Sequence, residues 1–412
     1  CDDRTYKEGV GGSSPSAPTR NTQIRYLDQG QAMMRTPITE MFGIEFPILA
    51  FSHCRDVVVA VSQAGGMGVL GAVALSDEQL EVDLAWIEDE IGDRPYGVDL
   101  VVPTKYAGDG QGGMQTSDIS TSIPDEHREF VAELLERYEV PEATDSQSEA
   151  GWTSKNADAP FSASRASEQL DIALAFNPRL VANALGSPPS DMIDRCHEAD
   201  IMVAALAGAL AHAERHVNAG VDLVIAQGYE AGGHTGEVAS MVLVPEIVDA
   251  VDPVPVLGAG GIGRGRQMAA AMALGAAGVW CGSVWLTTEE AETPPVAKAK
   301  LLEAGSGDTL RSRSYTGKPA RLLRSAWTDE WNRDDTPDPL GMPLQPMLID
   351  GAMARINRAA HHAGSGAEKL VTYPVGQIVG SMNKSRPAGR VVMDMVEEFI
   401  ESAESLAGQL EI

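Results

Sequence analysis

The chain has 412 residues, 43% of them hydrophobic, and a formal net charge of −28. This length suits one large α/β barrel with insertions, and the negative charge would repel nucleic acid and anionic membrane surfaces. The apolar runs are broken well before the roughly 20 residues that span a bilayer, and no stretch has the layout of a secretory signal, so we expect a cytoplasmic protein.

Residues 1–35 lack an apolar pattern and are expected to be a disordered or non-native leader. The four cysteines, Cys1, Cys54, Cys196 and Cys281, are scattered and form no CxxC pair. This pattern argues against a disulfide framework or a structural zinc site, and buried thiols are expected instead.

From Pro47 onward, short β-rich runs alternate with amphipathic or Ala-rich stretches, which is typical of repeated βα units. Eight such runs favour a closed (β/α)8 TIM barrel, expected over residues 36–288. The predicted strands are 47–50, 67–71, 96–102, 179–183, 200–206, 222–227, 254–258 and 277–282. The predicted helices between them are 77–91, 164–176, 189–199, 207–219 and 264–274.

The spacing breaks after the third strand, where residues 104–163 form an insertion that includes a capped amphipathic helix at 124–138. Loops after barrel strands surround the active-site mouth, so the insertion is a candidate lid, with a surface decoration as the alternative. Residues 289–373 lose the βα rhythm and are expected to form a helical subdomain. Within 374–412, an amphipathic helix at 386–409 is expected to close the barrel.

Two glycine clusters are candidates for phosphate binding, because a phosphate needs converging backbone N–H groups with no side chain in the way. Gly260 and Gly261 follow the seventh predicted strand, and Gly282 and Ser283 end the eighth. These two loops form the recurrent phosphate site of such barrels. Tight turns would explain either cluster alone, but the two together favour phosphate binding.

A polar, Gly-rich loop follows the sixth predicted strand and contains Gly232, Gly233 and His234. With little local bulk to bury it, the imidazole of His234 would face the barrel mouth, where it can accept or donate a proton. A solvated surface histidine is the alternative. His53, after the first strand, could also line the mouth. The other histidines are expected to be solvated: His127, His197, His212, His216, His361 and His362. No HExxH motif or carboxylate cluster predicts a metal.

These motifs together resemble the nitronate monooxygenase (2-nitropropane dioxygenase-like) family of FMN barrels. The resemblance is carried by AQGYEAGGHTGE (226–237) and by the run from VPVLGAGGIG to SVWLTTEE (254–290). Other matching segments are PITEMFGIEFPILA (37–50), AVSQAGGMGVLGA (60–72), RPYGVDLVVP (94–103) and SRSYTGKPARLLRS (312–325).

The resemblance implies a bound FMN and oxidation of a nitronate, or of its nitroalkane, with O₂ to a carbonyl compound and nitrite. His234 falls on the histidine regarded as the family's catalytic base or substrate-orienting group. The residues implied to hold FMN are Phe51, Ser52, Asp99, Gln227, Gly232, Gly233, Gly260, Gly261, Gly282 and Ser283.

Three features of the sequence depart from the family pattern. The strand-one loop reads Phe51-Ser52-His53 instead of a Gly-Met type sequence, Ser283 stands for the common Thr, and Asp99 replaces the usual Asn. A carboxylate at Asp99 could repel an electron-rich flavin.

Two other functions stay open. The same motifs are similar to flavin-dependent enoyl-acyl-carrier-protein reductases, which use NAD(P)H, and the altered strand-one loop suits a flavin-binding protein without turnover. The expected partners are a small-molecule substrate and O₂, without nucleic acid or membrane. The sequence leaves the oligomeric state open, with a homodimer as one option.

Overall fold

The structure is a computed structural model, and most of the chain beyond the first 33 residues is described. The described residues are 34–102, 121–142, 163–362 and 364–410. The predicted leader therefore lies almost wholly outside them, as does much of the predicted insertion at 104–163. No described helix has both the length and the hydropathy that a membrane crossing requires.

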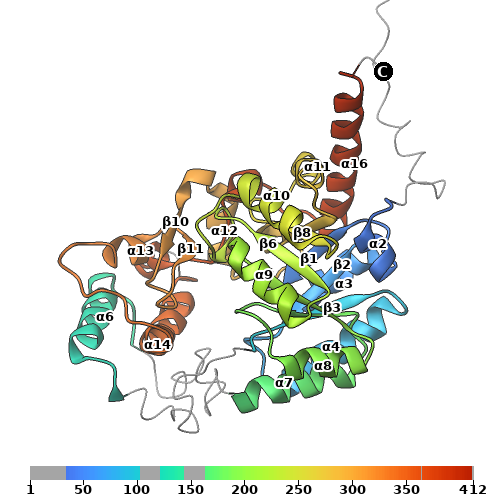
Figure 1. Cartoon of the computed structure of the whole chain (residues 1–412). Coiled ribbons are helices and arrows are strands. Elements are labelled where there is room, and N and C mark those ends of the chain that lie inside the picture. The colour runs from blue at the N-terminus through green and yellow to red at the C-terminus, as the bar shows by residue number, and fades with distance from the viewer. Residues whose placement is uncertain (1–33, 103–120, 143–162, 363, 411–412) are drawn as a thin grey trace, which may run out of the picture.

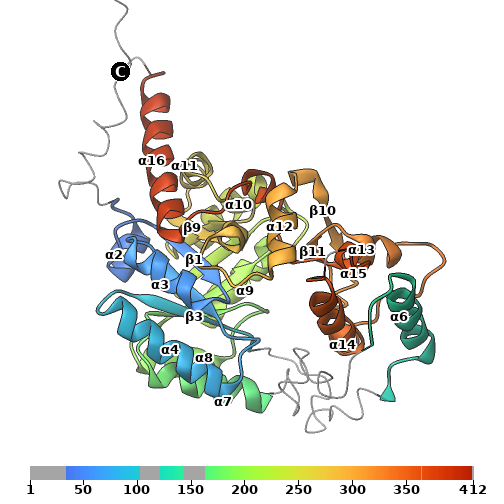
Figure 2. The same ribbon diagram turned by 180° about the vertical axis from the view of Figure 1, so that it is seen from behind.

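Eight parallel strands close into a barrel with helices between them, which confirms the predicted TIM barrel (Figures 1 and 2). The barrel strands are β1 (Ile48–Ser52), β2 (Met67–Gly71), β3 (Tyr96–Leu100), β4 (Leu180–Asn183), β5 (Met202–Ala207), β6 (Leu223–Gln227), β8 (Val256–Ala259) and β9 (Gly278–Cys281). The surrounding helices are α3 (Arg55–Gln63), α4 (Asp77–Ile91), α7 (Ala163–Ala175), α8 (Ser190–Glu198), α9 (Leu210–Ala219), α10 (Ser240–Val251), α11 (Gly265–Ala273) and α16 (Ala388–Ala407).

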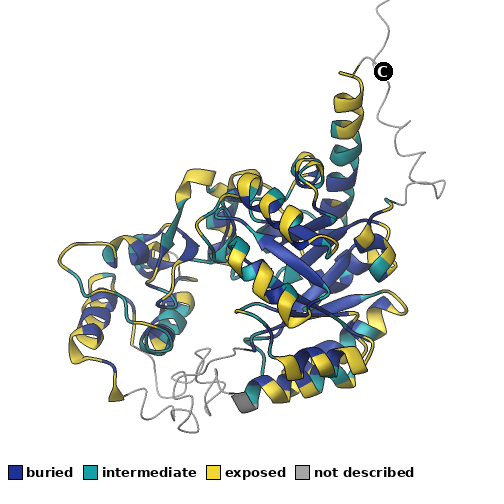
Figure 3. Ribbon diagram, viewed as in Figure 1, coloured by how far each residue is buried: buried dark blue, intermediate teal, exposed yellow. Residues whose placement is uncertain are grey.

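Side chains alternate between the barrel interior and the helical layer because successive residues of a strand point to opposite faces. In β1, Leu49 and Phe51 pack with the interior cluster, whereas Ile48 and Ala50 pack against the helices. Both faces are apolar and buried, as the dark blue strands of Figure 3 show. This explains why the strands read as continuous apolar runs in the sequence.

The N-terminal end of the barrel is closed by α2 (Pro37–Phe42). Thr36 caps this helix through a reciprocal hydrogen-bond pair with Thr39. Ile38 and Phe42 pack in the same cluster as the barrel interior. The opposite end, where the strands finish, is therefore the mouth.

The C-terminal helix α16 packs between α11 and α3, in the place of an eighth barrel helix. Val392 and Met395 are buried against the barrel core. Arg264 and Arg266, at the start of α11, form ion pairs with Glu398. The last turns of α16 are exposed and extend beyond the barrel (Figures 1 and 3).

The region after β9 contains helices and two strands. Its helices are η2 (Ser283–Thr287), α12 (Pro295–Glu303), η3 (Ser306–Asp308), α13 (Ala326–Glu330), α14 (Leu344–Ala359), α15 (Ala367–Leu370) and η4 (Gln377–Ser381). The strands β10 (Thr309–Ser312) and β11 (Ala320–Leu323) pair with β7 (Gly233–His234) in a small antiparallel sheet.

The described part of the insertion belongs to the same subdomain. The helix α6 (Asp125–Arg137) forms where it was predicted and buries Phe130, Val131 and Leu134 against a cluster from α13, α14 and α15. Figures 1 and 2 both show α6 beside α14, away from the barrel helices. Two segments far apart in the sequence thus share one core.

The crossing of α11 and α16 gives a stability test. A Cβ added at Gly265 would lie 2.1 Å from the backbone oxygen of Met395, so Gly265→Ala forces the helices apart. We expect a loss of about 1–3 kcal/mol in the free energy of unfolding, measured by urea denaturation. Gly351→Ala in α14 is the matched control, because a Cβ there meets nothing within 4 Å, and it should be neutral or stabilising. Equal stability of the two variants would contradict the close packing.

Candidate active site at the barrel mouth

The last inward-facing residues of the strands combine two polar side chains with small neighbours. Asp99 of β3 lies between Gly71 of β2 and Ala182 of β4, and Gln227 of β6 lies beside Ala259 of β8. A Cβ at Gly71 would lie 2.6 Å from Nδ1 of His53 and 2.8 Å from the ring of Phe51, so these two side chains occupy the space beside it. The Asp99 carboxyl makes no hydrogen bond to a described residue, and a buried polar group of this kind needs a partner.

Burial raises the pKa of Asp99 well above its usual range, because desolvation penalises the charged carboxylate. The side chain is 3% exposed, and no described cation offsets this penalty. Burial therefore favours the neutral form of this carboxyl more than it would that of an exposed one. A neutral carboxyl carries an O–H donor and a carbonyl acceptor, which resembles the amide of Asn.

The three residues Phe51, Ser52 and His53 lie where β1 reaches the mouth. The first two extend the strand beyond its predicted end, and the Phe51 ring points inward and stacks on Trp280 at 6.1 Å. The His53 ring meets the edge of Phe51 at 5.1 Å, and its Nδ1 lies 2.8 Å from the oxygen of Gly71. Burial lowers the pKa of His53, and the hydrogen bond to Gly71 opposes this shift. The rings of Phe51, His53 and Trp280 thus form an aromatic wall at the barrel mouth, near Asp99 and Gln227.

The glycine clusters have the backbone that close approach to a phosphate requires. Gly260 and Gly261 adopt positive φ angles of 96° and 69°, which L side chains rarely adopt. A Cβ at Gly261 would lie 3.2 Å from that of Glu230, and one at Gly282 would lie 3.6 Å from Phe51. Gly282 therefore borders the aromatic wall, and Gly260 and Gly261 follow β8 as the sequence predicted.

A C-terminal segment that the sequence did not implicate reaches both loops. The hydroxyl of Ser283 accepts a hydrogen bond from the amide of Gly376 at 2.8 Å, so its own proton is left to donate. A Cβ at Gly232 would lie 2.7 Å from that same amide nitrogen, and the amide of Gln377 donates to the oxygen of Glu230 at 2.9 Å. These contacts join residues that are far apart in the sequence. The only sign of them in the local sequence is the glycine at position 232.

His234 lies in β7, where the sequence predicted a loop. It pairs with Ala320 of β11, and its Nε2 lies 2.7 Å from the hydroxyl of Thr316. Burial lowers the pKa of His234 to about 4, and the charge of Lys318 adds to the effect. The imidazole is therefore neutral near pH 7.

Two arginines hold the loop that leads to His234. The guanidinium of Arg321 is buried and donates to the oxygen of Tyr229 at 3.0 and 3.2 Å and to the hydroxyl of Thr309. It also lies 4.5 Å from the centre of the Tyr229 ring, and Arg311 lies 5.2 Å from it. Arg311 donates in addition to the oxygen of Thr235. These contacts fix the loop on both sides of β7.

Two histidines expected to be solvated are buried, so that prediction was wrong. Nε2 of His127 lies 2.9 Å from the oxygen of Asp338, which explains its place inside the subdomain. The ring of His216 lies between the hydroxyl of Ser187 and the oxygen of Leu206. Amphipathic spacing does not reveal a polar side chain whose partners come from elsewhere in the chain.

One group of side chains among the described residues could approach a metal: Cys54, Asp56 and Glu292, whose ligand atoms lie within 4.8 Å of one another. The thiol of Cys54 donates to the oxygen of Glu290, and burial raises its pKa, which disfavours the thiolate that a metal requires. We assign no metal there. The described cysteines are all free and buried, as predicted.

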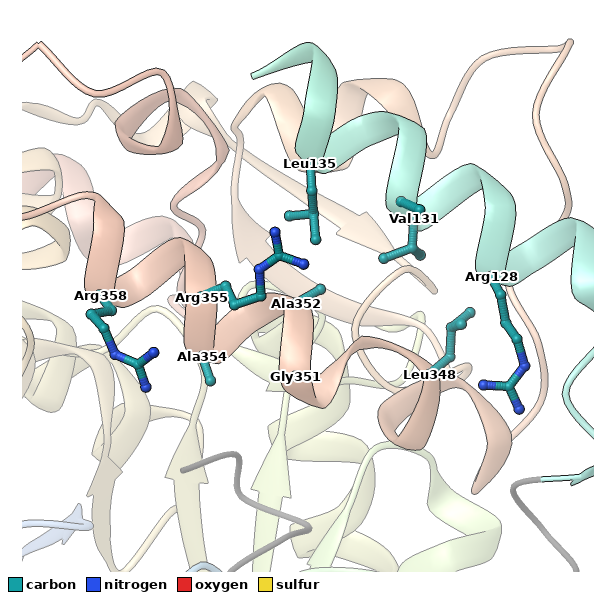
Figure 4. A pocket seen from close by; sticks show the side chains of 10 residues that line it. Arg128, Val131, Leu135, Leu348, Gly351, Ala352, Ala354, Arg355 and Arg358 are labelled. Atoms are coloured by element: carbon teal, nitrogen blue, oxygen red, sulfur yellow. The ribbon is translucent and has the colours of Figure 1, made fainter. Parts of the chain in front are cut away.

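A pocket also lies between α6 and α14 (Figure 4). Its residues are Arg128, Val131, Ala132, Leu135, Leu348, Gly351, Ala352, Ala354, Arg355 and Arg358. It lies in the subdomain, and none of the residues that follow the barrel strands lines it. We therefore place the candidate site at the barrel mouth.

Known proteins are similar to this chain over most of its length. Residues 35–398 match the family described as nitronate monooxygenase. A "Putative monooxygenase" of Mycobacterium tuberculosis is 60% identical over 375 residues, which cover 91% of this chain and 99% of that protein.

Two solved structures share the fold. A nitroalkane oxidase from Streptomyces ansochromogenes is 25% identical with a TM-score of 0.72, covering 89% of this chain and 99% of that one. FabK from Thermotoga maritima is also 25% identical, with a TM-score of 0.65, covering 92% of this chain and 100% of that one.

The neutral carboxyl of Asp99 gives a pH-dependent prediction for the protein without cofactor. As pH rises above the ordinary pKa of a carboxyl, Asp99 ionises in the unfolded chain but stays protonated in the folded protein. This stabilises the unfolded state, so the free energy of unfolding falls as pH rises towards the raised pKa. Asp99→Asn removes this loss and should increase the free energy of unfolding more at pH 8 than at pH 5. Each unit of pKa difference is worth about 1.4 kcal/mol. Thermal unfolding in which the variant gains nothing at pH 8 would show an ionised carboxylate.

Proposed function

The chain belongs to the nitronate monooxygenase family, and from this premise we propose that it binds FMN and oxidises nitroalkanes or their nitronates with O₂ to a carbonyl compound and nitrite. The family is flavin-dependent, and the chain is an oxidoreductase. The finer assignment of FMN, substrate and oxidant is supported by the residues at the barrel mouth.

The observation that carries the proposal is the neutral imidazole of His234. A general base must have a free lone pair at working pH, and burial together with Lys318 lowers the pKa of this imidazole to about 4, so it is unprotonated near pH 7. A nitroalkane has an acidic C–H bond next to the nitro group. The proton of that bond would pass to His234, and the electron pair would move onto the nitro group to give the nitronate.

The residues of the mouth fit the cofactor. Phosphate would bind at the loops of Gly260, Gly261, Gly282 and Ser283, which follow β8 and β9 and in which Gly260 and Gly261 have positive φ angles. When bound, FMN supplies an acceptor for two electrons that O₂ can regenerate. The chain's own residues position the substrate and move its proton.

The residues that would hold the isoalloxazine part of the cofactor are Asp99, Gln227, Phe51, Ser52, Gly232 and Gly233. The expected repulsion between Asp99 and an electron-rich flavin does not arise if the carboxyl is neutral. A protonated carboxyl donates one hydrogen bond and accepts another, as the usual Asn does. Asp99 is thus compatible with the family's site.

A second candidate is an NAD(P)H-dependent enoyl-thioester reductase, which the motifs similar to those of flavin-dependent enoyl-acyl-carrier-protein reductases support. The two functions differ in the electron donor. Anaerobic mixing with propyl-nitronate and, separately, with NADPH decides between them through loss of the flavin absorbance. We expect bleaching by the nitronate. Bleaching by NADPH alone would support the reductase, and bleaching by neither would support a binding protein without turnover.

His234→Asn should keep bound FMN but slow anaerobic flavin reduction by a nitroalkane about 10²–10⁴-fold, the usual contribution of a general base. The bound flavin is measured by its absorbance after gel filtration, which separates loss of chemistry from loss of cofactor. His362→Asn, at an exposed position after α14, is the matched control and should reduce flavin at the parental rate. A His234→Asn variant as fast as the parent would refute the assigned role.

A further inference from the structure

The turn between β10 and β11 places one hydroxyl against His234. Oγ1 of Thr316 lies 2.7 Å from Nε2 of His234, 3.2 Å from the oxygen of Lys318 and 3.4 Å from the amide nitrogen of Lys318. Nδ1 makes no hydrogen bond to any residue in the described parts of the chain. One ring nitrogen is therefore engaged and the other is open.

The hydrogen-bonding capacity of the hydroxyl decides which nitrogen carries the proton. A hydroxyl has one proton to donate and two lone pairs to accept with. The Lys318 oxygen can only accept, so it takes the proton of Thr316, and the Lys318 amide can only donate, so it uses one lone pair. All three contacts are hydrogen bonds at once only when Nε2 donates to the second lone pair.

We propose that Thr316 is a positioning residue that holds the proton of the neutral His234 imidazole on Nε2 and so leaves Nδ1 as the atom that accepts the substrate proton. This inference rests on the proposed role of His234 as the base. In the step, the C–H proton of the nitroalkane moves to Nδ1 and its electron pair stays with the substrate. The imidazolium that results keeps its Nε2–H on Thr316.

The turn is rigid enough for this function. Gly317 has a φ of 80°, and a Cβ there would lie 2.3 Å from the oxygen of Leu340, so the backbone fits only glycine. Its amide donates to the oxygen of Arg313, and the fully buried Gln345 donates to the oxygen of Ser314 at 2.9 Å. Because its backbone is fixed, the hydroxyl of Thr316 can orient the ring of His234 before substrate binds. Supporting hydrogen bonds of this kind preorganise a catalytic site.

The test uses ring-¹⁵N-labelled histidine in the FMN-loaded protein near pH 7, with the His234 signals identified by their loss in His234→Asn. The parent should show a protonated Nε2, a bare Nδ1 and slow exchange of the Nε2 proton with water. Thr316→Val, which removes only the hydroxyl, should speed this exchange and slow flavin reduction by a nitroalkane roughly tenfold to a hundredfold while FMN stays bound. Thr316→Ser, which keeps the hydroxyl, should restore both.

The outcomes separate this inference from the proposed function. A parent signal with the proton on Nδ1 overturns the inference without any variant, and so does a Thr316→Val protein with parental proton exchange and parental rate. A third outcome has the proton on Nε2 in the parent and faster exchange of that proton in Thr316→Val, while His234→Asn reduces flavin at the full rate. In that case the hydrogen bond between Thr316 and His234 is confirmed and the catalytic role of His234 is refuted.

Discussion

The antiparallel pairing of β7 with β11 joins the barrel to the chain segment that follows it. β7 is only two residues long, yet it carries His234, and its partner strand is preceded by the turn that holds Thr316. The buried Arg321 reinforces the contact from β11 by holding the oxygen of Tyr229. Without this pairing, the loop after β6 would be a flexible Gly-rich segment and its imidazole would have no fixed direction. The candidate site is thus shared between the barrel and the subdomain.

Desolvation sets the charge state of the mouth. Burial raises the pKa of Asp99 and lowers that of His234 to about 4, so desolvation favours the neutral form of each group. The same protein carries a formal net charge of −28. The surface charge therefore says little about the site, where low dielectric surroundings act on each group separately. A neutral donor and a neutral acceptor suit a flavin and an uncharged carbon acid better than a pair of ions.

Some glycines at the barrel mouth are needed because two backbone segments pack closely against each other there. Gly232 and Gly376 come from segments far apart in the sequence, and a Cβ on either would enter the other's backbone. Ser283 joins the same contact through the amide of Gly376. The final segment before α16 therefore supports the loops that contain Gly232 and Ser283. A barrel in which this segment did not return would lack one wall of the candidate site.

The sequence by itself determined the barrel. Each of the eight buried strands is a mostly apolar run, and the helices have apolar residues at helical spacing, so both can be recognised from neighbouring residues alone. It also placed the glycines and His234 at the ends of strands. Only the tertiary structure decided that His234 pairs with β11, that Thr316 reaches its Nε2, and that Gly376 returns to Ser283. These contacts join residues many positions apart and leave no periodic trace. The titration of Asp99 was decided there too, since burial depends on the whole chain around a side chain and not on its neighbours in sequence.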